Sequence, residues 1–307
     1  MEHIFIINPV SGNTNPETYL RSKIQQIAEK LSLSYKILVT NYAGHAKKIA
    51  NTYSQTGKPI RFYACGGDGT FNEIVEGTLG YSNVDTACIP CGSGNDFVRN
   101  FGTKEDFLNL ENMILGDRIQ IDVITTQYGI ATAICSAGLD AQVAYGIPKF
   151  RRIPFCGGET SYKLSILTSL CSKLGHQLRI EADGEVFEDN FLMLAICNGK
   201  TYGGGFMAAP EADMQDGLLD FVMVKKVSRF RIAKVVNLYK QGKHIVNGCV
   251  LPEFQDVMTY RRVKNVHVEV LDHRPIIITK DGECAPRMIL DASITPRSAN
   301  IVLPKRK

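Results

Sequence analysis

The chain has 307 residues, of which 44% are hydrophobic and 21% charged, a composition that is typical of a globular protein and excludes a disordered one. Its 35 basic and 31 acidic residues leave a formal net charge of +4, which is too small an excess to indicate nucleic acid binding. No stretch approaches the roughly 18 consecutive apolar residues of a transmembrane helix, so any membrane contact is expected to be peripheral. The length allows two domains of ordinary size.

The cysteines and the N-terminal segment indicate the cellular compartment in which the protein functions. The chain has nine cysteines, an odd number, and several of them lie inside apolar runs. This usage favours free thiols in a reducing, cytoplasmic compartment. The N-terminal segment is acidic and short, and it predicts a buried strand where a signal peptide would need a basic start.

Strand-like and helix-like segments alternate over residues 1–123. The expected strands cover residues 3–8, 34–40, 59–65 and 84–89, and the expected helices cover residues 16–32, 44–53 and 71–79. This alternation predicts a Rossmann-like α/β domain with a parallel sheet. Ligands bind beyond the carboxyl ends of the strands in such sheets. We therefore expect the loops at residues 8–12, 40–45, 66–72 and 90–96 to meet at one edge.

The pattern changes after about residue 120. Residues 124–307 contain short β-branched runs separated by turn residues, which predicts a C-terminal β-sandwich domain. Two helical patterns, at residues 159–174 and 228–246, interrupt these runs. We place the domain boundary at residue 123. Packing of the last residues of the chain on the first domain is an open alternative.

The segment Gly66-Gly67-Asp68-Gly69-Thr70 follows an expected strand and precedes an expected helix. Glycines leave the backbone N–H groups open to an anion, and the start of a helix adds a partial positive charge. Asp68 would repel a phosphate unless a divalent cation lay between them, and Mg²⁺ is held by one or two carboxylates together with phosphates. The segment therefore predicts a nucleotide and Mg²⁺ site, with a tight turn that needs glycine as the alternative.

A second glycine-rich loop, Gly92-Ser93-Gly94-Asn95-Asp96, also follows a strand. Asp96 supplies a second carboxylate at the same expected edge, although an aspartate before a helix is often only its N-cap. The chain has no G-x-x-x-x-G-K-[ST] motif and no G-x-G-x-x-G after its first strand. These absences exclude a P-loop and an ordinary dinucleotide fingerprint.

Together with Asn8-Pro9-Val10-Ser11-Gly12, these two loops resemble, in order and spacing, three blocks of the diacylglycerol kinase catalytic family. That family includes sphingosine and ceramide kinases and soluble bacterial lipid kinases. The resemblance extends into the second half, through Asp216-Gly217-Leu218-Leu219-Asp220 and Asp281-Gly282-Glu283. The Gly66–Thr70 block alone is shared with NAD kinases, whereas the combination is specific.

The resemblance implies roles for individual residues. Glu283 would be the general base for the lipid hydroxyl, and Asp68 would organise the catalytic Mg²⁺ with Asp96 and, as a further member, Asp122. A second, structural Mg²⁺ would be held by Asp213, Asp216 and the backbone of Leu218; turn formation beside Gly217 is the alternative there. The residues expected at the ATP site are Asn8, Ser11, Gly12, Thr40, Gly66, Gly67, Asp68, Gly69, Thr70, Phe71, Asn72, Glu73, Gly92, Ser93, Gly94, Asn95 and Asp96.

The implied activity is an ATP- and Mg²⁺-dependent lipid kinase that converts diacylglycerol to phosphatidic acid. Alternatives are a kinase of sphingoid bases, ceramide or phosphatidylglycerol, an NAD kinase, and a protein that binds nucleotide or lipid without catalysis. The lipid would be met at the inner face of the membrane, through residues 149–155 or the basic helical segment at 228–246. No nucleic acid partner is expected, and a homodimer remains open.

Overall fold

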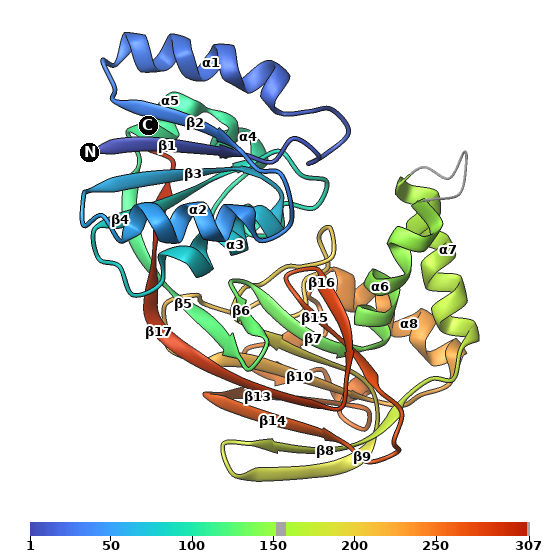
Figure 1. Ribbon diagram of the computed structural model, residues 1–307. Helices are drawn as coiled ribbons and strands as arrows, with labels where there is room; N and C mark the ends of the chain where they lie inside the picture. Colours follow the sequence, from blue (N-terminus) through green and yellow to red (C-terminus); the bar gives the residue numbers. More distant parts are fainter. Residues whose placement is uncertain (152–157, 306–307) are drawn as a thin grey trace. The chain divides into compact units, whose positions relative to one another are not determined.

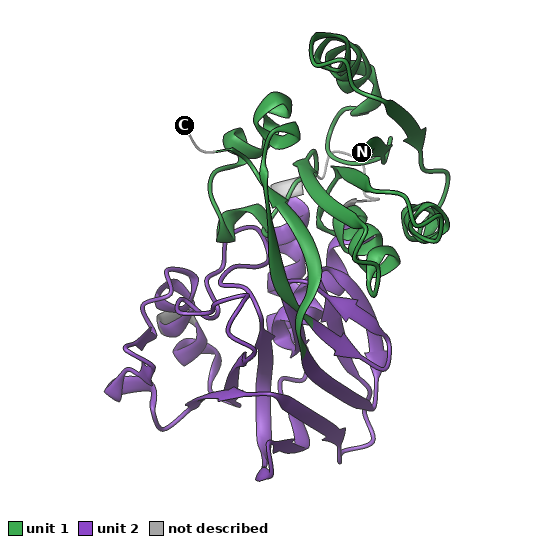
Figure 2. Cartoon of the chain, turned by 90° about the vertical axis from the view of Figure 1, so that its left-hand side faces the viewer, with its two compact units in different colours: residues 1–123, 295–307 green, residues 124–294 purple. Residues whose placement is uncertain are grey.

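The computed structural model describes residues 1–151 and 158–305. Two compact units make up the chain: unit 1 contains Met1–Val123 and Thr295–Lys307, and unit 2 contains Ile124–Ile294 (Figure 2). The chain therefore passes between the units twice, once within strand β5 (Asp117–Thr126) and once within strand β17 (Ile289–Leu303).

Unit 1 is built on a parallel sheet with the strand order β17-β4-β3-β1-β2. Helices α2 and α3 pack together on one face and α1 packs with α5 on the other, as right-handed crossovers require (Figure 1). Because helices cover both faces, β3 and β4 are buried along their whole length. The elements are β1 (Glu2–Ile7), α1 (Glu17–Lys30), β2 (Tyr35–Val39), α2 (His45–Ser54), β3 (Ile60–Gly66), α3 (Asp68–Thr78), β4 (Val84–Pro90), η1 (Val98–Asn100), α4 (Lys104–Leu108) and α5 (Leu110–Ile114).

Unit 2 is antiparallel, with the strand order β16-β15-β7-β9-β8-β14-β17 and with β10 between β9 and β13. The elements are β6 (Gly129–Ala131), β7 (Ile134–Gly138), α6 (Leu139–Arg151), α7 (Gly158–Cys171), β8 (His176–Ala182), β9 (Glu185–Cys197), β10 (Leu219–Lys225), α8 (Arg229–Lys240), β11 (Ile245–Val246), β12 (Cys249–Val250), η2 (Pro252–Phe254), β13 (Met258–Val263), β14 (Asn265–Val270), β15 (Ile276–Lys280) and β16 (Glu283–Arg287).

The sheet of unit 2 has an apolar cluster on each face. Along β9, Leu194 and Ile196 belong to one cluster, whereas Ala195 and Cys197 belong to the other. Side chains alternate between the faces of a strand, so both faces of β9 are packed and the strand is apolar over consecutive residues. The two units together confirm the expected fold class, an α/β domain joined to a β-rich domain.

Three helices differ from the sequence-based expectation. Helix α3 begins at Asp68, three residues early, because Gly67 is extended and turns the chain directly into the helix. Helix α8 ends at Lys240, since Gly242 adopts a φ of 70° that stops the helix. Helix α6 was not expected. Of the predicted membrane segment 149–155, residues 152–155 lie outside the described residues.

Within residues 1–151 and 158–305, no helix combines the length and the hydrophobicity needed to cross a bilayer.

Candidate functional site

The two glycine-rich loops lie against each other at the carboxyl ends of β3 and β4. Gly66 pairs with Pro90 across these parallel strands, and the N–H groups of Cys91 and Gly92 donate to the carbonyl of Gly66 at 2.8 and 3.2 Å. A Cβ atom on Gly92 would lie only 2.5 Å from Cα of Gly67. Glycine is therefore needed at position 92 so that the two backbones can touch.

Asp68 joins the two loops through its carboxylate. It is the first residue of α3, and its two oxygens accept hydrogen bonds from the N–H groups of Asp96 and Phe97, each at 3.2 Å. A Cβ atom on Gly94 would lie 3.2 Å from Oδ2 of Asp68 and 3.6 Å from Oδ2 of Asp96. The two carboxylates thus point into the same small space beside the Gly94 backbone.

This pair of carboxylates fits a bound Mg²⁺. No group of three or more histidine, cysteine or acidic side chains forms a metal cluster among the described residues. Mg²⁺ does not require one, because it is usually held by one or two carboxylates, several waters and the phosphates of a nucleotide. Asp68 and Asp96 supply two carboxylates, and the absence of a side chain at Gly94 keeps the space between them open.

The first predicted loop, at residues 8–12, lies beside these two. The side-chain amide of Asn8 donates to Oγ1 of Thr70 at 3.0 Å, and its N–H donates to the carbonyl of Cys65 at 3.0 Å. Gly12 adopts a φ of 77°, and a Cβ atom there would collide with the carbonyl oxygen of Cys91. The structure therefore brings the loops after β1, β3 and β4 together, as expected for one edge of a parallel sheet.

Several predicted nucleotide-binding residues use their side chains to position the loops. Glu73 accepts hydrogen bonds from the N–H groups of Gly44 and Ala46, at 2.7 and 3.1 Å, and so holds the start of α2. Phe71 is fully buried and packs on Phe97 with 4.1 Å between ring centroids. Their direct contact with a nucleotide remains a prediction.

The loop after β2 contributes an aromatic pair that the sequence analysis missed. The ring of Tyr42, which is 57% exposed, stacks on His45 with 4.7 Å between centroids and 11° between planes. Thr40 places this loop beside the first one, since its N–H donates to the carbonyl of Ile7 at 2.9 Å. Both residues lie in the connection after β2, Tyr42 within the loop and His45 as the first residue of α2, so the sequence already placed them near the carboxyl end of a strand.

Asp122, the predicted further member of the Mg²⁺ network, lies within a strand, whereas Asp68 and Asp96 follow strand ends. It lies in β5, is completely buried, and accepts a hydrogen bond from the N–H of Arg297 at 2.7 Å. Asp122 thus ties β5 to β17 within unit 1. A contribution of Asp122 to Mg²⁺ binding remains a prediction.

Glu283 belongs to unit 2, whereas Asp68 and Asp96 belong to unit 1. It opens β16 directly after a turn in which Asp281 and Gly282 adopt φ values of 42° and 94°. The Asp281 carboxylate accepts hydrogen bonds from the N–H groups of three consecutive residues, 132–134, and so fixes this turn. The Glu283 side chain is 56% exposed, with the ammonium of Lys280 at 3.7 Å.

The same tripeptide, Asp-Gly-Glu, occurs at residues 183–185 between β8 and β9. There the glutamate is occupied, because Arg261 donates to both oxygens of Glu185 at 2.8 and 3.0 Å. Glu283 has no such bidentate guanidinium partner among the described contacts. The two hairpins therefore differ in whether their glutamate is available for chemistry.

The residues of the predicted second metal site make contacts with other parts of the protein. The carboxylates of Asp213 and Asp216 accept hydrogen bonds from the N–H groups of Gln215 and Leu218, at 3.0 and 2.9 Å, which is turn formation. The other oxygen of Asp216 forms an ion pair with the guanidinium of Arg262. A structural Mg²⁺ at these residues remains a prediction, with turn formation as the alternative.

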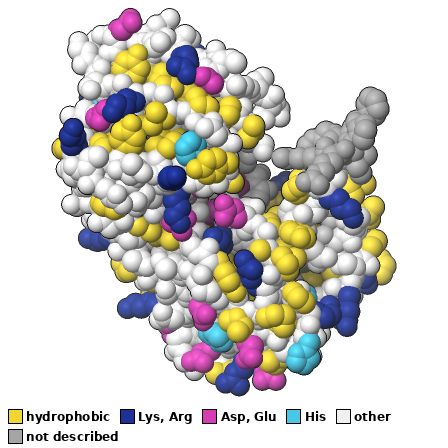
Figure 3. Space-filling model, in the orientation of Figure 1, with side chains coloured by type: hydrophobic (Ala, Val, Ile, Leu, Met, Phe, Trp, Pro, Cys, Tyr) yellow, Lys and Arg dark blue, Asp and Glu magenta, His cyan; other side chains and the backbone are white. Residues whose placement is uncertain are grey.

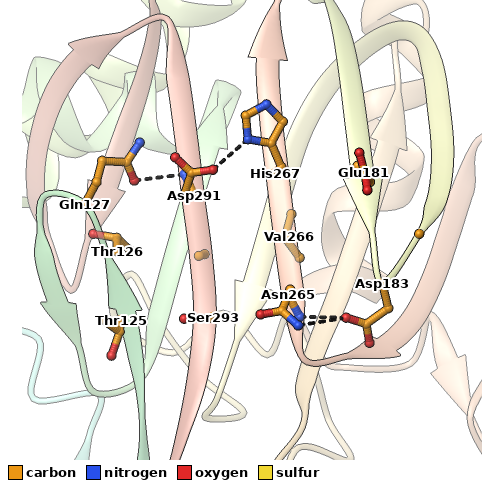
Figure 4. Close-up of a pocket in the computed structure, with 12 residues that line it drawn as sticks. Thr125, Thr126, Gln127, Glu181, Asp183, Asn265, Val266, His267, Asp291 and Ser293 are labelled. Atoms are coloured by element: carbon orange, nitrogen blue, oxygen red, sulfur yellow. Dashed lines mark hydrogen bonds and ion pairs between the residues drawn. The ribbon is translucent and has the colours of Figure 1, made fainter.

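A hollow of about 570 Å³ lies on the sheet of unit 2 and contains none of the predicted site residues (Figure 4). Its polar groups largely satisfy one another: His267 Nδ1 pairs with Asp291 at 2.6 Å, and Asp183 accepts from the N–H of Asn265 at 2.9 Å. The hollow is therefore set aside, and the candidate residues remain those of the glycine-rich loops in unit 1 and, separately, of the Glu283 hairpin in unit 2.

Two family models match the chain. The diacylglycerol kinase catalytic domain matches residues 2–126, and the YegS C-terminal NAD kinase beta sandwich-like domain matches residues 133–303. The diacylglycerol kinase of Bacillus subtilis (strain 168) is 26% identical over 98% of this chain and 96% of its own length. That of Staphylococcus carnosus (strain TM300) is 25% identical over 91% of this chain and 87% of its own length.

A solved structure shares the fold. The crystal structure of a diacylglycerol kinase from Bacillus anthracis str. Sterne is 18% identical and has a TM-score of 0.69, covering 98% of this chain and 96% of its own. The family models and the curated relatives define the class of the protein as a phosphotransferase of the lipid kinase type. The chain belongs to the diacylglycerol kinase catalytic family and is a diacylglycerol-type lipid kinase.

Proposed function

We propose that the protein transfers the γ-phosphoryl group of ATP to the hydroxyl of a lipid alcohol in a Mg²⁺-dependent reaction, with diacylglycerol as the substrate and phosphatidic acid as the product. The observation that carries the proposal is the convergence of Asp68 and Asp96 beside Gly94. Phosphoryl transfer asks a protein mainly to position the reactants and to neutralise charge. When bound, Mg²⁺ would supply that neutralisation.

The three loops of unit 1 would bind the nucleotide. Backbone N–H groups at the start of α3 and in the Gly92–Asp96 loop are suited to phosphate oxygens. Asp68 is held in place by two N–H donors, so it would present a carboxylate of fixed orientation. The stacked Tyr42 and His45 rings offer a flat surface of the kind on which a base can stack.

Glu283 would take the proton from the lipid hydroxyl. An alcohol is a weak nucleophile, and a positioned carboxylate is a suitable general base. The proposal is supported by the exposure of the Glu283 side chain, by the rigid Asp281 turn that carries it, and by the contrast with the paired Glu185.

The lipid would be reached by peripheral contact with the inner, anionic face of a membrane. Helices α7 and α8 expose Leu167 (59%) and Phe230 (89%). A neighbouring hollow of about 490 Å³ is lined by Lys173, Lys226 and Arg229 and by no acidic side chain. Apolar and basic side chains lie close together over this part of unit 2 (Figure 3), which is the composition that favours an interfacial contact.

The test is a transfer assay with labelled ATP, Mg²⁺ and mixed micelles that contain diacylglycerol, sphingosine or phosphatidylglycerol, with NAD as a soluble acceptor. We expect transfer to a lipid and none to NAD. Asp68→Asn and Glu283→Gln should each lower turnover by about 100-fold or more, because each removes a group that acts on the reacting atoms.

Glu185→Gln is the matched control, since it changes the same residue type in the same tripeptide and should keep wild-type turnover. Transfer to NAD alone would contradict the lipid kinase assignment. A Glu283→Gln protein with near wild-type turnover would refute the proposed base.

A further inference from the structure

Lys280, the last residue of β15, lies directly beside the proposed base. It pairs with Glu283 across the β15–β16 hairpin and with Cys135 of β7. Directly paired residues point to the same face of a sheet, so these three side chains share one face. Cys135 belongs to the apolar cluster on that face. The side chain of Lys280 therefore starts on an apolar surface, next to Glu283.

The side chain of Lys280 is much less exposed than those of other lysines in ion pairs. It is 14% exposed. In the part of the chain that the structure describes, the other lysines with an acidic partner are 46% to 61% exposed: Lys30, Lys36, Lys47 and Lys225. Removing a charge from water costs free energy unless the charge is paired. The position of Lys280 therefore requires compensating partners.

Two oxygen atoms supply this compensation. Nζ of Lys280 donates to the carbonyl of Tyr128 at 2.6 Å and lies 3.7 Å from a carboxylate oxygen of Glu283. Tyr128 is itself fixed, because its hydroxyl donates to the carbonyl of Ile289 at 2.9 Å. Its ring centroid also lies 4.3 Å from the guanidinium carbon of Arg287. The carbonyl thus anchors the ammonium group, and the ammonium group attracts the Glu283 carboxylate.

The distance between Lys280 and Glu283 decides what this glutamate can still do. At 3.7 Å the two groups attract each other, but the contact is too long for a hydrogen bond. Arg261 acts differently on Glu185, since it donates to both carboxylate oxygens at 2.8 and 3.0 Å. A general base needs a free oxygen within hydrogen-bond reach of the proton that it takes. Lys280 restricts the rotamers of Glu283 and leaves its oxygens available.

We propose that Lys280 is a positioning residue, which holds the Glu283 carboxylate in the orientation that accepts the proton of the lipid hydroxyl. This inference rests on the proposed lipid kinase function and adds one residue to it. Lys280 acts through Glu283 and not on the substrate. Loss of its charge should therefore slow the chemical step and leave ATP binding by the loops of unit 1 unchanged.

The first test separates the charge of Lys280 from its hydrogen bond. Lys280→Gln keeps a donor for the Tyr128 carbonyl and removes the charge, whereas Lys280→Met removes both. With labelled ATP and a lipid that the wild type phosphorylates, each variant should lower kcat by about tenfold or more, because a misplaced catalytic group is costly. The KM for ATP should not change. Arg261→Met is the matched control, since it removes the cation from Glu185, and it should keep wild-type kcat.

A double-mutant cycle shows whether Lys280 acts through Glu283. In a Glu283→Gln protein, Lys280→Gln should cause no further loss of kcat, because no carboxylate is left to orient. A lysine with a merely structural role would lower kcat by the same factor in both backgrounds, and this result would overturn the inference. A Lys280→Gln protein with wild-type kcat would refute the positioning role alone. Melting curves establish that each variant is folded.

A water-soluble carbodiimide tests the contact in the wild-type protein without turnover, since it joins a neighbouring amine and carboxylate as an amide with loss of one water. Mass spectrometry of peptides should detect an amide between Lys280 and Glu283, and Glu283→Gln should abolish it. A wild type without this crosslink would contradict the inference. If the crosslink forms but the wild type phosphorylates no lipid, the proposed function fails, and the positioning role fails with it.

Discussion

Asp140, the second residue of α6, shows at the scale of a single residue how a buried carboxyl can oppose folding. Burial raises the pKa of its carboxyl from 3.8 to about 6. The folded protein then holds this proton more tightly than the unfolded chain does. Stability is therefore lost as the pH rises from 3.8 to about 6, and the full penalty is present above that range.

We expect Asp140→Asn to raise the free energy of unfolding above pH 6, by at most about 3 kcal/mol, because one pKa unit corresponds to about 1.4 kcal/mol. The gain should shrink as the pH falls towards 4. Urea unfolding at pH 7.5 and at pH 4.5 measures both values. Asp256→Asn is the control of opposite sign, since Arg231 lowers the pKa of Asp256 and the pair is lost on substitution. An Asp140→Asn protein that is less stable than the wild type at pH 7.5 would show that the ionised Asp140 carboxylate does not destabilise the folded state.

Asp68 and Glu283 also show the limit of what a sequence reveals about single residues. The glycines around Asp68 predicted a carboxylate at a strand end, and the structure places it there. The residues of the turn alone do not distinguish Glu283 from Glu185, because both stand in an Asp-Gly-Glu turn, and only the resemblance to the family singles out Glu283. The difference arises from Arg261, which is distant in sequence from either turn and approaches only Glu185.

At the scale of elements, the α/β part was predictable because its strands and helices each have one clear hydrophobic period. Helix α6 was not, since Gly146 and Pro148 interrupt its pattern. The structure explains the glycine: a Cβ atom at position 146 would collide with Ser165 of α7. Close packing of α6 against α7 thus stabilises a helix in a segment whose local sequence disfavours one.

The contact between the loops after β3 and β4 is an element-scale constraint that can be tested. Gly92→Ala would place a Cβ atom 2.5 Å from the Gly67 backbone, so one of the two loops has to move. We expect a loss of about 1 to 3 kcal/mol in the free energy of unfolding, the usual range for overpacking. Turnover should fall as well, because Asp68 and Asp96 are positioned by these loops.

Gly69→Ala is the matched control for stability. Position 69 lies in the first turn of α3, and a Cβ atom there would meet nothing within 4 Å. Thermal melts of the two variants give the comparison. Equal melting temperatures for Gly92→Ala and the wild type would show that the loops are not in close contact.

At the scale of the whole molecule, the proposed membrane contact combines apolar exposure with local positive charge, although the net charge is only +4. Phe230→Ser should weaken binding to vesicles with anionic headgroups by about tenfold, since inserting one aromatic ring contributes about 1.5 to 3 kcal/mol. Cosedimentation at low and at 0.5 M salt measures the apolar and electrostatic contributions.

Val186→Ser, which changes another exposed apolar residue in a hairpin of unit 2, should bind as the wild type does. Equal loss in both variants would indicate a nonspecific effect of surface hydrophobicity. If both variants bind vesicles as tightly as the wild type, the first turn of α8 does not enter the membrane.

The path of β17 has a consequence for synthesis on the ribosome. Unit 1 is discontinuous, and its strand β4 pairs with Ile301 and Val302 near the end of the chain. Unit 2 is one uninterrupted stretch that is translated before them. Unit 2 can therefore fold while unit 1 still lacks an edge strand, and a nascent chain that is cut short by a dozen residues would carry a complete unit 2 beside an unfinished unit 1.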